Sequence, residues 1–195
     1  MRLHFRRGVP IVITAAWGAA VVAGLSLMWG YGAMPGKNGH PRARWPESTL
    51  VRPVTGRANL VMAVHPRCPC TRASIAELAR LMARCKGSVE AHVLFLAPAS
   101  MQKGWERSDL WSSASLIPGV HPITDAAGSE SARFGLETSG HVSLYDAAGN
   151  LGFTGGITDT RGHEGDNAGL DEVVNTLNGH ATRTADYPVF GCPIF

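Results

Sequence analysis

The sequence has few charged residues and no large excess of either charge. Charged side chains make up 17% of the 195 residues, and 18 basic residues stand against 15 acidic ones. So small an excess excludes a dedicated nucleic-acid surface, because such surfaces need many clustered cations. The length excludes a large multidomain enzyme, since it suffices for one compact domain with an appendage.

Cysteine is also scarce, and the sequence contains no internal repeats. Four cysteines are too few for a small fold held together by disulfides. Two of them, however, stand one residue apart in Cys68-Pro69-Cys70, while Cys85 and Cys192 lie elsewhere. The chemistry of the protein is therefore to be sought at this pair.

Charge is absent altogether from Gly8 to Gly36. Residues 10–29 hold the roughly 20 apolar residues that a helix needs to cross a bilayer, so we predict a transmembrane signal anchor there. Three arginines precede it (Arg2, Arg6 and Arg7). They predict a cytoplasmic N-terminus at 1–9 and a soluble part on the periplasmic side, although basic residues also follow the helix. A cleaved secretory signal is the alternative, with the same compartment.

Two further segments flank the predicted soluble domain, which spans residues 59–180. Residues 30–58 are rich in glycine and proline, which predicts a flexible linker; packing along the domain is equally allowed. Residues 181–195 form a C-terminal tail that carries Cys192. Outside the cytoplasm, disulfide chemistry is available to the cysteines.

Hydrophobic periodicity predicts a βαβ unit, a connection and a ββα unit in the domain. The expected strands are 59–64, 91–96, 119–124, 141–145 and 151–157. The expected helices are 71–85, 129–134 and 167–177, with a further helix within 97–118 covering the sheet. The first unit is a right-handed parallel crossover, and turn residues at 146–150 predict a hairpin.

This order, with cysteines at the first strand-to-helix junction, resembles the thioredoxin fold: α/β, a central mixed sheet flanked by helices, here preceded by one transmembrane helix. The run VHPRCPCTRA at 64–73 is similar to the segment that carries Cys-x-x-Cys in membrane-anchored bacterial thioredoxin-like proteins. The segments HPRCPCTRASIAEL, GGITDTRGHEGDNAG and VFGCPIF are similar to the small RedB-type group of that superfamily. The resemblance implies thiol chemistry at the cysteine motif.

Cys68 and Cys70 are the predicted catalytic residues. Pro69 suits the first position of a helix, which makes Cys68 the N-cap. There the helix dipole favours a thiolate, and we expect the cations Arg67 and Arg72 to favour it as well. A Cys68–Cys70 disulfide would be strained, and strained disulfides suit an oxidant or isomerase.

The sequence departs from the thioredoxin pattern at two places. Thr71 stands where the family has its resolving cysteine, so Cys70 or Cys192 has to resolve; Cys192 is otherwise structural or an unpaired thiol. Cys85 lies on the apolar stripe of the same helix and is predicted to be a core residue.

The second departure is Gly140, which replaces the cis-proline that the resemblance implies against the active cysteine. Glycine there lets a substrate backbone approach closely. His141 is adjacent and either orients a thiol, binds a metal or is structural, and His65 is a further neighbour of the cysteines.

We expect a thiol-disulfide oxidoreductase without a cofactor, acting on protein thiols, disulfides or a redox partner. The alternatives are a Cu(I)-binding or copper-delivery module with Cys68, Cys70 and His141 as ligands, a peroxide reductase using Cys68, and a non-catalytic docking domain. The loop 160–167 is assigned no chemistry, and its Asp166 or Asn167 is expected to cap the last helix.

Overall fold

The computed structural model describes residues 4–180 and 186–195. The chain divides into two compact units, one that ends at Met34 and one formed by Pro35–Phe195. The first unit holds one long helix, and the second holds the sheet with the remaining helices.

The first unit is the single helix α1 (His4–Ala33). Its part Val9–Ala33 is long and apolar enough to cross a membrane, in agreement with the segment predicted at 10–29. Length and composition are shared by membrane anchors and by signal sequences. Residues 1–3 of the predicted cytoplasmic N-terminus lie outside the described residues.

The second unit is built on one mixed sheet with the strand order β3-β2-β1-β4-β5-β6. The strands are β1 (Ala58–Val64), β2 (Val89–Ala97), β3 (Val120–Ala126), β4 (Val142–Tyr145), β5 (Leu151–Gly155) and β6 (Asp186–Tyr187). The helices are α2 (Pro69–Arg84), α3 (Asp109–Ser115), α4 (Ser129–Phe134) and α5 (Ala168–Leu177). β1, β2 and β3 are parallel, whereas β4 is antiparallel to both β1 and β5. The predicted strands and helices are confirmed, whereas the short β6 is not predicted by the sequence patterns.

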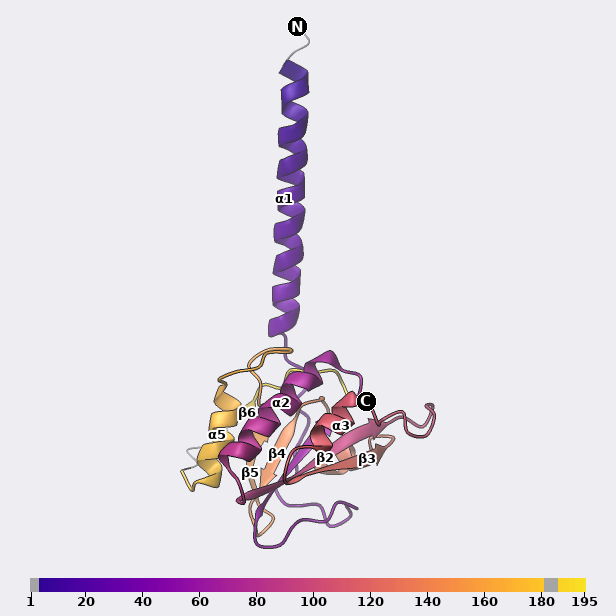
Figure 1. The fold of residues 1–195 in the computed structure, drawn as a ribbon, viewed down its shortest axis with the longest axis vertical. Helices are drawn as coiled ribbons and strands as arrows, with labels where there is room; N and C mark the ends of the chain where they lie inside the picture. Colours follow the sequence, from indigo (N-terminus) through magenta and orange to yellow (C-terminus); the bar gives the residue numbers. More distant parts are fainter. Residues whose placement is uncertain (1–3, 181–185) are drawn as a thin grey trace. The chain divides into compact units, whose positions relative to one another are not determined.

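Helices α2, α3 and α5 cover one face of the sheet, and Figure 1 shows α2 and α3 beside each other on it. The helix α2 turns an apolar stripe toward the strands, so that Ile75 and Leu78 pack with Met62 of β1 and Val142 of β4. Cys85 belongs to the same core and is 7% exposed, which confirms its predicted role. This topology, with β1 leading directly into α2, is that of the thioredoxin fold.

The other face of the sheet receives only one short helix in the described part of the chain, α4, and irregular segments complete its cover. The indole of Trp45 packs edge-on against Phe134 and Tyr145, with ring centroids 5.0 and 5.3 Å apart. Val51 and Ile194 are buried in the same cluster. The apolar side chains on this face are thus buried in part by the segment that precedes β1 and by the segment that ends the chain.

The segment predicted as a flexible linker at 30–58 therefore packs along the domain from Gly36 onward. The N–H of Gly36 donates to Val189 O (2.7 Å), that of His40 to Gly135 O (2.9 Å), and that of Trp45 to Gly149 O (2.8 Å). Of the two alternatives for this segment, the structure shows the packed one. Glycine and proline indicate irregular backbone, but they do not exclude backbone pairing or the burial of an occasional large side chain.

Candidate functional site

Cys68 lies where β1 leads into α2. It is the N-cap residue of α2 with Pro69 in the first turn, as predicted, and its own side chain makes no capping hydrogen bond. The backbone N–H of Cys70, in the first turn, nevertheless contributes by hydrogen bonding to the lowered pKa of Cys68. The side chain is only 1% exposed, so the structure places a reactive type of residue in a nearly closed environment.

A chain of hydroxyl groups connects Cys68 to the loop before β4. The hydroxyl of Ser139 accepts a hydrogen bond from His65 N (2.9 Å) and lies 2.7 Å from Thr71 Oγ1. Thr71 Oγ1 lies 3.4 Å from His65 O, to which it can donate, and hydrogen bonding of Thr71 with Cys68 helps to lower the pKa of that thiol. The residue at the family's resolving position is thus a hydroxyl beside the thiol.

The C-terminal tail brings a third thiol to this place. Cys192 forms a hydrogen bond with Cys68, and Cys70 forms one with Cys68 as well. All four cysteines are free thiols in this structure, and Cys192 is partly exposed. Three of the predicted residues are therefore brought together, while Cys85 caps the opposite end of α2.

The tail runs antiparallel to the loop before β4. Ser139 N donates to Cys192 O (2.8 Å), Ile194 N donates to Glu137 O (2.8 Å), and Thr138 forms an isolated antiparallel bridge with Pro193. A strand-like pairing on both sides of Cys192 holds its thiol against Cys68.

Apolar burial and one glycine anchor the same tail. Val189, Phe190 and Ile194 are all less than one tenth exposed. A Cβ at Gly191 would lie 1.9 Å from Ser139 O, a distance that real side chains do not reach. Only glycine lets the tail approach the loop this closely.

The three thiols influence one another's pKa values in opposite directions. Burial is the largest influence on Cys68 and opposes its charge, but the hydrogen bonds from Cys192 and Thr71 outweigh it and lower its pKa. Burial, reinforced by the hydrogen bond to Cys68 and by its charge, raises the pKa of Cys192 to about 12. Burial and the charge of Cys68 also raise the pKa of Cys70. Of the three thiols, Cys68 is therefore the one whose surroundings favour the thiolate.

The two arginines predicted to favour the Cys68 thiolate are not among the causes of its lowered pKa. Arg67 lies over the Trp105 ring, 5.2 Å from its centroid, and Arg72 forms an ion pair with Asp109. Instead, Arg161 donates through Nη1 to Gly191 O (2.7 Å) and hydrogen-bonds to Cys70. The loop 160–167 therefore contributes to the site, whereas its Asn167 caps α5 as expected.

His141 and Gly140 serve packing in the structure. Val142 faces α2, so its neighbour His141 points to the opposite face of the sheet, where its Nε2 lies 2.8 Å from the hydroxyl of Thr154. Gly140 has φ +88°, and a Cβ there would lie 2.7 Å from Ser74 Oγ. It is α2 that approaches Gly140, and this arrangement favours a structural role for both residues.

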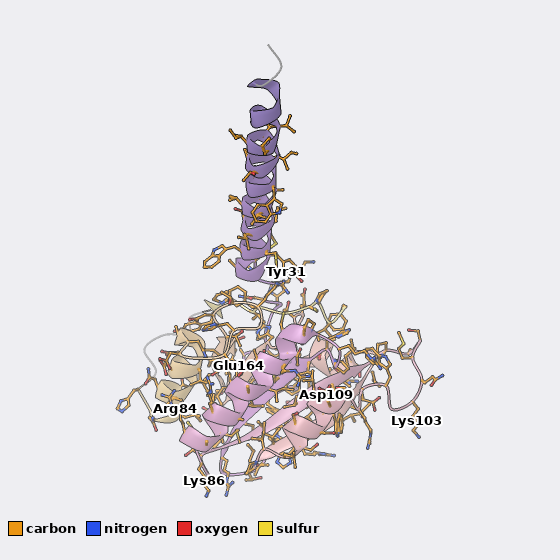
Figure 2. All side chains as sticks on the ribbon, turned by 45° about the horizontal axis from the view of Figure 1, so that its top comes forward. Tyr31, Arg84, Lys86, Lys103, Asp109 and Glu164 are labelled. Atoms are coloured by element: carbon orange, nitrogen blue, oxygen red, sulfur yellow. The ribbon has the colours of Figure 1, made fainter. Side chains whose placement is uncertain are left out.

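A groove of about 380 Å³ leads to Cys68 between the starts of α2 and α3. Its lining consists of Pro66, Arg67, Cys68, Pro69, Arg72 and residues 108–110. Figure 2 labels Asp109, the first residue of α3, which borders the groove, and shows Lys103 on a loop that projects from the domain. The ring of His65 stands edge-on to Trp105 at 5.7 Å beside the groove, and burial lowers the pKa of His65.

Sequence reasoning missed Ser139 and Arg161. Ser139 directly precedes the glycine at the cis-proline position, so its place in the chain was a usable signal. Arg161 lies in a loop that is distant in sequence from every cysteine, and no local pattern marks its contact with Cys70.

No family model and no curated protein matches the sequence. A crystal structure of a hypothetical protein from Sinorhizobium meliloti 1021 is 19% identical, with 84% of this chain and 96% of that one covered at a TM-score of 0.59. An uncharacterized conserved protein from Geobacillus kaustophilus is 17% identical, with 83% and 92% covered at 0.60. A secreted Mycobacterium tuberculosis disulfide oxidoreductase is 16% identical, with 64% of this chain and 83% of that one covered at a TM-score of 0.45. The first two likenesses show a shared fold, and the function has to be inferred from the site itself.

Proposed function

We propose that the protein is a membrane-anchored thiol-disulfide oxidoreductase of the thioredoxin-like superfamily, with its domain on the periplasmic side. The observation that carries this proposal is the contact of Cys68, Cys70 and Cys192 around the N-terminus of α2, with the pKa of only one thiol lowered. The finer resemblance to the RedB-type group forms part of the same proposal. α1 supports the anchor by its length and composition.

The reaction begins with the Cys68 thiolate. A substrate disulfide reaches it through the groove, the thiolate attacks one of its sulfurs, and the other substrate sulfur leaves as a thiolate. This step removes the negative charge of Cys68, and with it one cause of the high pKa of Cys192. Cys192 then loses its proton, attacks Cys68 and releases the second substrate thiolate. The substrate gains two electrons, and the protein keeps a Cys68–Cys192 disulfide.

The tail makes Cys192 a better resolving residue than Cys70. Cys70 stands only two residues from Cys68, so a bond between them would be strained. Cys192 is held against Cys68 by backbone pairing of its own segment. Because the lowered pKa of Cys68 stabilises the reduced form, the Cys68–Cys192 disulfide is expected to be an oxidising one.

The test is differential alkylation and peptide mapping of the full-length chain in glutathione buffers of graded potential. We expect one reversible Cys68–Cys192 disulfide, and we expect Cys68→Ser to reduce the turnover of a model disulfide to the rate of buffer alone. Cys85→Ser is the matched control and should stay within about twofold of the wild type, since Cys85 is remote from the site. Turnover that survives Cys68→Ser would refute the mechanism.

Copper binding is the second candidate, because soft thiolates suit Cu(I). Among the described residues, no group of three or more His, Cys, Asp or Glu side chains is arranged to hold a metal ion, and His141 is directed to Thr154. A copper site would therefore rest on two thiolates at Cys68. An anaerobic Cu(I) titration that gives one equivalent, lost in Cys68→Ser, would favour this function.

A further inference from the structure

Once oxidised, the site presents two different sulfurs to an incoming thiol. We propose that the thiolate of an electron donor, distinct from the disulfide substrate, attacks the Cys68–Cys192 disulfide at Sγ of Cys192, so that the mixed disulfide forms on the tail and not on α2. This inference rests on the proposed function. It gives the two half-reactions different positions: the disulfide substrate meets Cys68 through the groove, and the donor thiol meets Cys192.

Access to the two residues supports this assignment. Cys68 is 1% exposed, whereas Cys192 is partly exposed and is followed by the exposed Pro193. The tail is anchored by Phe190 before Cys192 and by Ile194 after it, both nearly buried. Cys192 is therefore a fixed point on the surface rather than the end of a loose segment.

The leaving group supports the same direction. Thiol-disulfide exchange is faster when the departing thiolate is the more stable one. Cys68 is the better leaving group, because it returns to the helix N-terminus and to the hydroxyl of Thr71. A departing Cys192 thiolate would have the charge of Arg161 nearby, but neither the hydroxyl of Thr71 nor the start of a helix.

Arg161 supplies a charge at the point of attack. Its guanidinium contacts both Gly191 O, next to Cys192, and the thiol of Cys70. An approaching thiolate is negative, so a cation one residue from the sulfur under attack raises its local concentration. We infer that Arg161 is a positioning residue for the incoming thiol.

The exchange balances without a further reactant. The donor thiolate bonds to Sγ of Cys192, the Cys68–Cys192 bond breaks, and its electron pair leaves on Sγ of Cys68. A second donor thiolate then attacks the donor sulfur bound to Cys192. The donor disulfide is formed, Cys192 leaves as a thiolate and takes a proton from water, and two electrons have passed from the donor to the protein.

The experiment uses the full-length chain in detergent, oxidised with the non-thiol reagent diamide and freed of reagent, so that glutathione serves only as the donor thiol. Reduced glutathione is added, the reaction is quenched with acid at early times, and acid proteolysis with mass spectrometry locates the glutathione. We expect glutathione on Cys192 and a free thiol at Cys68. Glutathione on Cys68 or Cys70 overturns the inference alone, whereas a failure to form any Cys68–Cys192 disulfide overturns the proposed function with it.

A charge variant gives a second readout. Arg161→Gln should slow the attack by glutathione about threefold to tenfold at low salt, with a smaller effect at high salt. Arg84→Gln is the control, because Arg84 pairs with Asp171 at the other end of α2. Equal rates for the two variants would remove Arg161 from the reaction.

Discussion

Cys68 and Cys192 are the same kind of residue, yet their surroundings move their pKa values in opposite directions. Cys68 gains donors at the start of α2, while Cys192 has burial and a negative neighbour to overcome. Neither effect depends on the cysteine itself. At the residue scale, reactivity is therefore a property of position, and the same reasoning holds for a histidine far from the site.

His92 is expected to make the stability of the domain depend on pH. Its ring is 4% exposed and lies 3.2 Å through Nε2 from Asn59 Oδ1, beside His121 and Glu90. Burial, and then the neighbouring His121, lowers the pKa of His92 to about 4. The unfolded chain binds a proton near pH 6.5, so stability is complete above that pH and is lost as the pH falls toward 4.

Between pH 6.5 and 4, His92 is expected to lower the free energy of unfolding by about 3 kcal/mol. Urea unfolding at several pH values measures it, and His92→Gln should flatten the dependence between pH 6.5 and 4. Carboxylates titrate in the same pH range, so the comparison is between the slopes of unfolding free energy against pH for the wild type and for the variant. Identical slopes would contradict the prediction.

At the scale of elements, the decisive contact is the pairing of the tail with the loop before β4. It places Cys192 at the start of α2, and it uses backbone groups of Glu137 and Ser139 that an extended peptide would otherwise pair with. The tail of the domain therefore occupies the backbone groups that a bound peptide could pair with.

Gly191→Ala is expected to dislodge the tail without removing a thiol. Its Cβ would lie 1.9 Å from Ser139 O, so the backbone has to separate, and the unfolding free energy should fall by about 1–3 kcal/mol. The yield of the Cys68–Cys192 disulfide in a fixed glutathione buffer should fall about tenfold or more, in line with a loss of over 1.4 kcal/mol in their contact.

Pro193→Ala is the matched control for this experiment, since Pro193 lies in the same tail with an exposed side chain. It should form the disulfide as the wild type does. A normal disulfide yield in Gly191→Ala would mean that the tail does not need its present path to present Cys192.

At the scale of the whole molecule, the chain consists of a long apolar helix and a thioredoxin-like unit. If α1 spans a bilayer, a charge near its centre should prevent stable insertion. Val21→Arg is expected to cost about 2.5–3.5 kcal/mol of insertion free energy, because a guanidinium has no partner in hydrocarbon. The membrane fraction that resists alkaline carbonate extraction measures this, and it should fall strongly.

Val21→Leu keeps the helix apolar and should behave as the wild type. Full extraction of the wild-type chain, with an intact mass that lacks α1, would identify a cleaved signal instead of an anchor.

The fold was largely readable from local patterns. The run at 59–64, the amphipathic stretch after Pro69 and the strand at 91–96 together predict the βαβ unit, because apolar periodicity reports directly on which face of an element is buried. The packing of 36–51 cannot be predicted in this way, because one tryptophan and scattered backbone hydrogen bonds have no periodicity to detect.

By itself, the sequence determined that Cys68 begins a helix, since Pro69 can stand in a first helical turn at no cost, and that Cys85 faces the core. Only the tertiary structure decided that Cys192 lies beside Cys68, that Arg161 contacts Cys70, and that the hydroxyl of Thr71 lies beside the Cys68 thiol. The physical reason is that propensity and periodicity act over a few neighbouring residues. Contacts across more than a hundred residues depend on how the sheet, the loop before β4 and the tail pack together.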